Sequence, residues 1–454
     1  MEAIRPLNHS QRLLETLILA PLRSTSKGFY LLVAILLGII AWGVYAYSLQ
    51  LRDGLIVTGM RDRVSWGLYI AMYVFFVGAS MAGTFVSAIL RITKAGWRTP
   101  ITRAAEMVTV AALPIAALFI LFNSRQNPHM TLYKLTMFSR WESPITWDVY
   151  GLITYLTASL IYLYVALIPD LAYARDHIGA QASMAQRWFF RTFAIGWQNN
   201  PLQRRYLRLA ETVMMILVLP IAVAMHTVTA WLFAMTLRDP WDNPMFGIYF
   251  VGGAIFSGVG IIVILIALLR KVYKLENFIT RKHFLYLGYL LAAFAGVMFY
   301  FNVSEFVTHA YKLRGDMSLF LQEQFYGPMA PLYWAYLWGG LVAPVAIVLL
   351  PFTRNITGIV VASVLVNLAM FIERYLIVVG GLQLPLNPYE IASYSPTWVE
   401  WSLLAAGVAV FVLIVVVFLK LVPALAVTEM LEENGTANKS DSPPRPLERN
   451  LGIF

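Results

Sequence analysis

Ionisable side chains within or beside long apolar runs are the residues of this sequence that could do chemistry. Asp148 and His226 each lie within an apolar run, and Asn123 and Arg125 follow directly after another. A histidine titrates near neutral pH, and a carboxylic acid shielded from water can do the same. An amide and a guanidinium hold polar oxygen atoms by hydrogen bonds. These residue types suit a site where a bound molecule gives up protons.

A second set of such residues occurs later in the chain. Asn302, Glu305 and His309 follow i, i+3, i+7 spacing, which places them on one face of a helix. Glu373 and Arg374 are adjacent within another apolar run, so we expect that they point apart and that one of them meets Glu305. Two interpretations stay open: a buried ion pair that locks two helices together, or a path that conducts protons.

Membrane-spanning helices must position these residues. Only 13% of the 454 residues are charged, whereas a soluble domain carries about a quarter. A helix needs about 20 apolar residues to cross the hydrocarbon, and ten stretches qualify. The predicted spans are 28–49, 66–90, 104–122, 147–168, 210–232, 247–269, 285–311, 332–350, 356–380 and 398–419. The predicted fold class is an all-α integral membrane protein with ten transmembrane helices.

The distribution of basic residues predicts the orientation. Of the 34 Lys and Arg residues, 24 lie in the two terminal segments and in the connections after spans 2, 4, 6 and 8. Basic residues concentrate on the cytoplasmic side, so both termini are predicted to be cytoplasmic and the chain to lie in the cell's inner (cytoplasmic) membrane. The net charge of +10 is therefore a topology signal and indicates membrane lipid, not nucleic acid, as the surroundings.

Composition divides the chain into three parts. Residues 1–27 are predicted to be a cytoplasmic segment without a cleavable signal, and residues 28–425 the membrane domain. The polar residues 432–454 are predicted to be a disordered cytoplasmic tail.

A short internal sequence repeat relates span 2 to span 6. Trp66-Gly67-Leu68-Tyr69 resembles Phe246-Gly247-Ile248-Tyr249, and both spans run inward. The repeat predicts two four-helix bundles with the same orientation in the membrane. They are helices 2–5 (66–232) and helices 6–9 (247–380), flanked by helices 1 and 10. A chance match is the alternative.

The topology places Asn123, Asp148 and His226 at a similar depth near the outer surface of the first predicted bundle. Oxidising a quinol releases two protons with two electrons, so its site needs an acceptor near each hydroxyl. An acid and an imidazole at this depth are therefore compatible with a quinol site. From the residue types alone we favour the simpler interpretation, in which Asp148 caps its helix and His226 bonds a neighbouring carbonyl.

Three carboxylates lie near the predicted cytoplasmic ends of spans 3, 4 and 5, namely Glu106, Asp170 and Glu211. They are candidates for the inner mouth of a proton path. Solvated helix ends are the simpler interpretation, and we expect that one.

Several cofactors are excluded. The chain has no cysteine, which excludes a cysteine-ligated iron–sulfur cluster, a disulfide framework and a Cys-metal site. A haem needs two facing histidines, and only His226 and His309 lie within predicted spans, both near the same surface. No haem, iron–sulfur cluster or metal is therefore expected in this chain.

Several stretches resemble the polysulfide-reductase membrane-subunit (NrfD-like) family. They run from span 2 to span 9 and include the following: Trp66-Gly67-Leu68-Tyr69-Ile70, Trp97-Arg98-Thr99, Trp147-Asp148-Val149, Leu167-Ile168-Pro169-Asp170, Leu275-Glu276-Asn277-Phe278 and Glu373-Arg374-Tyr375. Within that family, the length and these stretches most resemble the large quinol-oxidising membrane subunit of alternative complex III.

The resemblance implies a quinone or menaquinone site near the periplasmic face. Electrons would pass between that site and an extracytoplasmic iron–sulfur subunit, with a molybdopterin-type or multihaem cytochrome subunit beyond it. Asp148 would be the carboxylate beside the quinone, with His226 matching a family histidine. Glu305 and the pair Glu373-Arg374 match positions proposed for proton movement.

Two residues depart from the alternative complex III pattern. Asn123 and Met81 stand roughly where histidines are expected. An amide cannot accept a proton at neutral pH, so proton acceptance falls to Asp148 and His226, or this chain is an inactive paralogue.

Other functions remain open. A secondary transporter also uses repeats and buried charges, and Pro114 and Pro220 are expected to interrupt spans 3 and 5, as in transporters. A purely structural membrane anchor without a quinone site is the third interpretation.

Overall fold

The computed structural model describes residues 25–93, 95–123, 139–178, 183–236, 240–312, 317–384 and 391–423, with isolated residues beside them. Within these ranges the regular structure is helical throughout. Ten helices are long and apolar enough to cross a membrane, so the predicted ten-helix class is confirmed. Arg125, the tail 432–454 and most of residues 1–27 lie outside the described residues.

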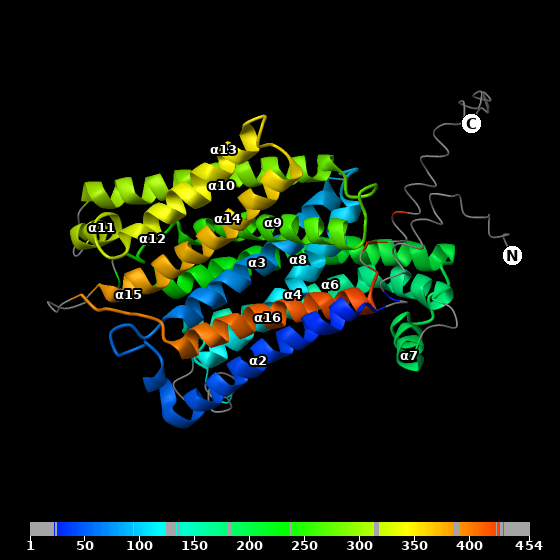
Figure 1. The fold of residues 1–454 in the computed structure, drawn as a ribbon, viewed down its shortest axis with the longest axis horizontal. Coiled ribbons are helices and arrows are strands. Elements are labelled where there is room, and N and C mark those ends of the chain that lie inside the picture. Colours follow the sequence, from blue (N-terminus) through cyan, green and yellow to red (C-terminus); the bar gives the residue numbers. More distant parts are fainter. Residues whose placement is uncertain are drawn as a thin grey trace, which may run out of the picture.

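The helices, labelled as in Figure 1, follow one another along the chain. The long ones are α2 (Lys27–Asp53), α3 (Leu68–Ile92), α4 (Thr99–Phe122), α6 (Pro144–His177), α8 (Pro201–Ala234), α9 (Phe246–Val272), α10 (Arg281–Lys312), α14 (Ile356–Tyr375) and α16 (Trp398–Leu421). One span consists of α12 (Ala330–Trp334), the π-helical η2 (Ala335–Val342) and α13 (Ala343–Leu349). The span of α14 continues through the π-helical η3 (Leu376–Gly380) into α15 (Gly381–Gln383). The shorter elements are η1 (Gly54–Val57), α7 (Met184–Phe193) and α11 (Met317–Phe325).

Capping residues explain where several helices begin. The Asn200 side chain accepts a hydrogen bond from the Gln203 amide at 2.8 Å, and Pro201 occupies the first turn. Asn355 caps α14 in the same way through the Gly358 amide. The helices α6 and α8 extend beyond the predicted spans 147–168 and 210–232, since the more polar stretches 169–177 and 201–209 are helical as well.

The expected interruptions at Pro114 and Pro220 are wrong. Both prolines lie inside continuous helices, α4 and α8. A proline removes one backbone hydrogen bond and bends a helix, but packing by neighbouring helices allows it to continue. Within the described spans, π-helical turns occur instead in η2 and η3, in the eighth and ninth spans.

For description we call α3, α4, α6 and α8 the first group and α9, α10, α12–α13 and α14 the second group. Helices pack on one another within each group, and α3 and α8 of the first group also pack against α9 of the second, so the two-bundle arrangement stays a prediction. The pair α2 and α16 packs beside the first group (Figure 1). The parallel relation between the two groups stays a prediction. We call the end at which α3, α6 and α9 begin the outer end, because it is the predicted extracytoplasmic one.

The helix α3 forms the centre of the molecule. In its apolar stretch 83% of the residues are buried, against 17% in that of α2. Small residues bring α3 against α9: a Cβ on Gly78 would touch Ala254, and a Cβ on Gly258 would overlap Ala82. The backbones of the two groups therefore approach closely along this seam.

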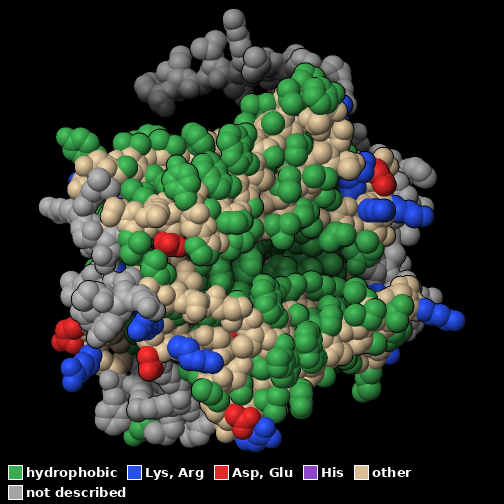
Figure 2. All heavy atoms as spheres, turned by 60° about the vertical axis from the view of Figure 1, so that its left-hand side comes forward, with side chains coloured by type: hydrophobic (Ala, Val, Ile, Leu, Met, Phe, Trp, Pro, Cys, Tyr) green, Lys and Arg blue, Asp and Glu red, His purple; other side chains and the backbone are tan. Residues whose placement is uncertain are grey.

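The outer surface of the body suits a hydrocarbon environment. Figure 2 shows hydrophobic side chains over most of the visible side, with charged ones towards its edges. Exposed apolar residues such as Leu31, Val44 and Leu368 come from several helices. This pattern is the one expected for helices that face lipid.

The segment before α16 is fixed to the start of α3. The Tyr394 hydroxyl accepts a hydrogen bond from the Leu68 amide at 2.8 Å and donates one to the Glu400 carboxylate. Burial and the Glu400 charge raise the pKa of Tyr394 well above its ordinary value. Gly67 lies against this phenol, where any side chain would overlap the ring.

Candidate functional site

Asp148 lies near the outer end of the first group, with 2% of its surface exposed. The Tyr73 hydroxyl of α3 donates to its Oδ2 at 2.5 Å, and the Thr229 hydroxyl of α8 donates to its Oδ1 at 2.6 Å. The carboxylate thus joins three helices. Ser143, not Asp148, precedes α6, so the capping interpretation of Asp148 is wrong.

His226 lies one turn before Thr229 on α8 and is also buried. Its Nδ1 is 2.9 Å from the Ala222 carbonyl oxygen, and its Nε2 is 2.9 Å from the Val77 carbonyl oxygen of α3. A neutral imidazole carries one N–H and can donate to only one of them, whereas a protonated ring donates to both. His226 therefore has the backbone acceptors that the second interpretation expected, arranged so that they also suit an imidazolium.

Asn123 ends α4 at the same outer end. Its side-chain oxygen Oδ1 is buried and has no hydrogen-bond partner among the described residues. Arg125, predicted to act beside it, belongs to the connection 124–138, most of which lies outside the described residues. Met81 is buried in α3. The structure thus places Asp148 and His226 in the same group of helices: Thr229, one turn after His226 on α8, bonds the Asp148 carboxylate.

Hydroxyl groups continue inward from His226 through the first group. The Tyr155 hydroxyl donates to Thr84 Oγ1 at 3.0 Å and to the Ser80 carbonyl at 3.1 Å. Thr84 in turn shares a 3.2 Å contact with Thr109. Further inward on α3, Ser87 is 3.1 Å from the Tyr162 hydroxyl. We call these side chains, with Asp148 and His226, the polar column.

The polar column ends in a buried ion network at the inner end. Arg103 is 3.2 Å from Glu106 and 2.6 Å from Asp170, and Arg91 is 3.4 Å from Glu106 and 3.6 Å from Glu211. Ser87 donates to Glu106 at 3.0 Å, which joins the network to the column.

The expectation of solvated helix ends is wrong for Glu106 and Asp170, which are only 2% and 0% exposed. Each is buried because Arg103, from the first turns of α4, folds between α4 and α6. Glu211 retains 21% side-chain exposure.

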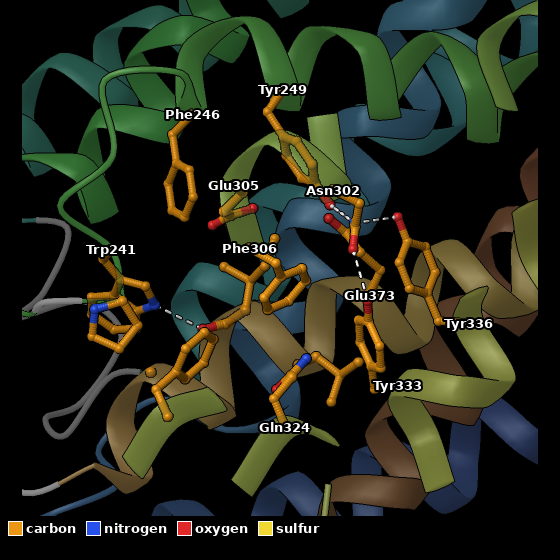
Figure 3. A pocket seen from close by; sticks show the side chains of 15 residues that line it. Trp241, Phe246, Tyr249, Asn302, Glu305, Phe306, Gln324, Tyr333, Tyr336 and Glu373 are labelled. Atoms are coloured by element: carbon orange, nitrogen blue, oxygen red, sulfur yellow. Dashed lines mark hydrogen bonds between the residues drawn. The ribbon is translucent and has the colours of Figure 1, made fainter. Parts of the chain in front are cut away.

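The second group holds a pocket near the outer end, drawn in Figure 3. Glu305 and Glu373 both line it, together with aromatic rings from several segments. Asn302 Nδ2 donates to the hydroxyls of Tyr249 at 3.2 Å and Tyr336 at 3.0 Å. His309 Nε2 is 3.8 Å from Glu305.

The expectation that Glu373 and Arg374 point apart is wrong. Arg374 Nη1 is 3.2 Å from the Glu373 carboxylate, and its guanidinium lies 4.6 Å from the centre of the Phe250 ring. The long arginine side chain folds back because Gly253 of α9 leaves space for it: a Cβ there would overlap Nη2. Glu305 lies beside His309 instead, and it shares the pocket with Glu373.

Sequence reasoning missed several residues of the first group. Tyr73, Ser80, Thr84, Ser87 and Arg91 all lie on one buried face of α3. Their spacings of seven, four, three and four residues are the signal that could have found them, because polar side chains that recur with the helical period inside an apolar span form a stripe. Their partners from α6 and α8 could not be read in this way.

Among the described residues, no group of three or more His, Cys, Asp or Glu side chains is close enough together to hold a metal ion. The site is thus composed of hydroxyls, carboxylates, guanidinium groups and imidazole. Of these groups, hydroxyls, carboxylates and imidazole can accept or donate protons, whereas the guanidinium groups stay charged.

Ten apolar helices around buried acid and hydroxyl groups define a multi-pass membrane protein. The chain belongs to the NrfD family: a family model described as "Polysulphide reductase, NrfD" matches residues 56–385. The predicted family is therefore confirmed.

Three relatives are similar over most of their length. A putative dimethyl sulfoxide reductase membrane subunit of Halobacterium salinarum is 27% identical, over 89% of this chain and 93% of the relative. A selenate reductase subunit of Mesobacillus selenatarsenatis is 21% identical, over 84% and 91%. An Hdr-like menaquinol oxidoreductase integral membrane subunit of Archaeoglobus fulgidus is 25% identical, over 89% and 96%.

Proposed function

We propose that this chain is the quinone-interacting membrane subunit of an oxidoreductase complex. It exchanges electrons between the quinone pool and an extracytoplasmic iron–sulfur subunit, which connects to a molybdopterin-type or multihaem cytochrome subunit. Membership of the NrfD family and relatives named as reductase and menaquinol oxidoreductase membrane subunits support this proposal. The basic connections support an inner-membrane orientation with cytoplasmic termini.

The single observation that carries the proposal is the buried carboxylate of Asp148 between α3, α6 and α8. Two hydroxyl donors occupy two of about four lone-pair positions of a carboxylate, so the remaining ones can accept a hydrogen bond from a quinol hydroxyl. Asn123, whose buried Oδ1 has no partner among the described residues, and Arg125 would position the head group. These groups fit a quinol as substrate.

The reaction balances without a cofactor in this chain. A quinol loses its two hydroxyl protons and two electrons and leaves as the quinone, with the electrons passing to the iron–sulfur partner. Asp148 accepts one of the two protons. His226 accepts the other, and its ring nitrogens donate hydrogen bonds to the carbonyls of Ala222 and Val77. Each proton then leaves the site before the next turnover.

We further propose that protons move outward along the polar column, from the ion network at the inner end. The hydroxyls of Tyr155, Thr84 and Thr109 support this step, because each can donate and accept a hydrogen bond. Moving one charge against 100 mV costs about 2.3 kcal/mol. An electron acceptor of sufficiently high potential supplies that energy.

The test is Asp148→Asn, which preserves size and removes the proton acceptor. Quinol-dependent reduction of the partner should fall by about 100-fold or more, while the complex still assembles. Glu142→Gln is the matched control because Glu142 is an exposed carboxylate just before α6. Full activity of an assembled Asp148→Asn complex would refute the site.

A further inference from the structure

The pocket of the second group is separate from Asp148 and comes from other helices. Its walls come from the segment before α9, from α9, α10 and α11, and from the two spans that contain η2 and η3. Trp241, Phe246, Phe306 and Tyr333 supply aromatic faces (Figure 3). Such walls suit a planar ring, because aromatic groups stack or meet edge to face.

Acidic, amide and hydroxyl groups line the pocket together with the aromatic rings. Glu373 is 3% exposed, and its Oε2 has no hydrogen-bond partner among the described residues although Arg374 lies 3.2 Å away. Asn302 holds the hydroxyls of Tyr249 and Tyr336 beside it, and Glu305 points into the same space in Figure 3. A ligand here meets hydrogen-bond acceptors that are buried and only partly used.

The charges favour an uncharged ligand. Each carboxylate has a basic group beside it, Arg374 for Glu373 and His309 at 3.8 Å for Glu305. An organic cation would have to displace these partners, and an anion would face two carboxylates. A neutral molecule with hydroxyl donors can use the open acceptor positions without either cost.

Two π-helical stretches of backbone contribute to the wall of this pocket. The π-helical stretch η2 contains Tyr336, and η3 begins shortly after Glu373; such turns are frequent at functional sites. In η3 the Ile377 carbonyl accepts a hydrogen bond from the Trp241 indole at 2.8 Å, which fixes this ring as a wall of the pocket.

We propose that this pocket binds a second quinol head group, in addition to the one at Asp148. The ring lies between the aromatic faces, and its hydroxyls donate to Glu373 and Glu305. The inference rests on the proposed function only in that quinol is the lipid-soluble substrate available to the chain. It assigns two sites, one in each helical group.

The experiment uses the full chain in native membranes and a photoreactive azido-naphthoquinone, reduced to the quinol before illumination. Labelled peptides are mapped by mass spectrometry. We expect saturable labelling of α3 or α6 peptides and, separately, of α10, α12 or η3 peptides. Glu373→Gln and Phe306→Ala should each reduce the second labelling by about tenfold, the effect of losing one charge-assisted hydrogen bond or one aromatic wall. Phe306→Ala leaves every charge in place.

Two controls separate the outcomes. Glu276→Gln makes the same chemical change at an exposed inner position and should alter neither labelling. Asp148→Asn should reduce only the first labelling. Labelling confined to the first group, or second-group labelling that both pocket variants leave unchanged, overturns this inference while the proposed function stands. Labelling confined to the second group refutes the Asp148 site instead.

Discussion

The Tyr73 hydroxyl donates to the Asp148 carboxylate across 2.5 Å, and this bond joins the central helix α3 to α6. It also sets the direction in which the carboxylate points. With Thr229 on the other oxygen, the two donors hold both Asp148 oxygens in place. Asp148 is thereby positioned by groups that belong to two other helices.

Tyr73→Phe keeps the ring and removes this donor. We expect turnover with quinol to fall by about tenfold, because one hydrogen bond to a charged group is lost. Partner reduction by purified membranes measures the effect. Tyr69→Phe makes the same change one turn outward, where the hydroxyl bonds Gln50, and should leave turnover near the wild-type rate. Equal effects of both variants would argue against a specific role of Tyr73.

Thr84→Val tests the polar column. Valine has nearly the shape of threonine but cannot receive the bond from Tyr155 or exchange one with Thr109. Proton movement across vesicles should slow by about 100-fold, while quinol oxidation with an uncoupler present continues. A pH-sensitive dye inside the vesicles measures the first rate.

Thr157→Val is the matched control for that variant, since Thr157 is an exposed residue of α6 that bonds only its own helix. Unchanged proton movement in Thr84→Val would remove the column from the mechanism.

Arg103→Met tests the inner ion network. The change takes a cation from between Glu106 and Asp170, so the buried carboxylates lose a partner. Removing one member of a buried ion pair costs about 3–5 kcal/mol, and the melting temperature in detergent should drop accordingly. Arg191→Met on the exposed face of α7 should have little effect. A stable Arg103→Met protein would mean that water replaces the guanidinium.

Gly253→Ala tests the space for Arg374. A Cβ at this position overlaps Nη2 and crowds Met370 and Met298, so Arg374 must move from Glu373. We expect a loss of about 1–3 kcal/mol in stability, typical of overpacking. Gly296→Ala, where a Cβ meets nothing within 4 Å, should instead be neutral or slightly stabilising. Thermal unfolding of both variants gives the comparison.

The sequence was sufficient for the membrane spans and for part of the site. Apolar runs predict the ten helices because the bilayer demands about 20 apolar residues for each. Asp148 and His226 could be placed at one depth because depth follows from span order. Their partners Tyr73 and Thr229 could not, since the rotation of each helix about its axis depends on packing.

Two failed expectations have the same physical origin. Glu106 and Asp170 stand near helix ends, where water normally reaches, but Arg103 bends inward and buries them. Glu373 and Arg374 are adjacent, which normally separates side chains, but Gly253 on another helix gives the guanidinium room to return. In both cases a long flexible side chain reached a position that helical spacing alone does not give.

The close seam between α3 and α9 restricts how the molecule can work. Gly78 packs against Ala254. Gly258 packs so closely against Ala82 that a methyl group on Gly258 would overlap it. If the two halves rocked against each other to carry a solute, these backbones would have to separate and lipid or water would have to enter. The proposed function requires only that protons and electrons move, so these two helices can stay in contact throughout.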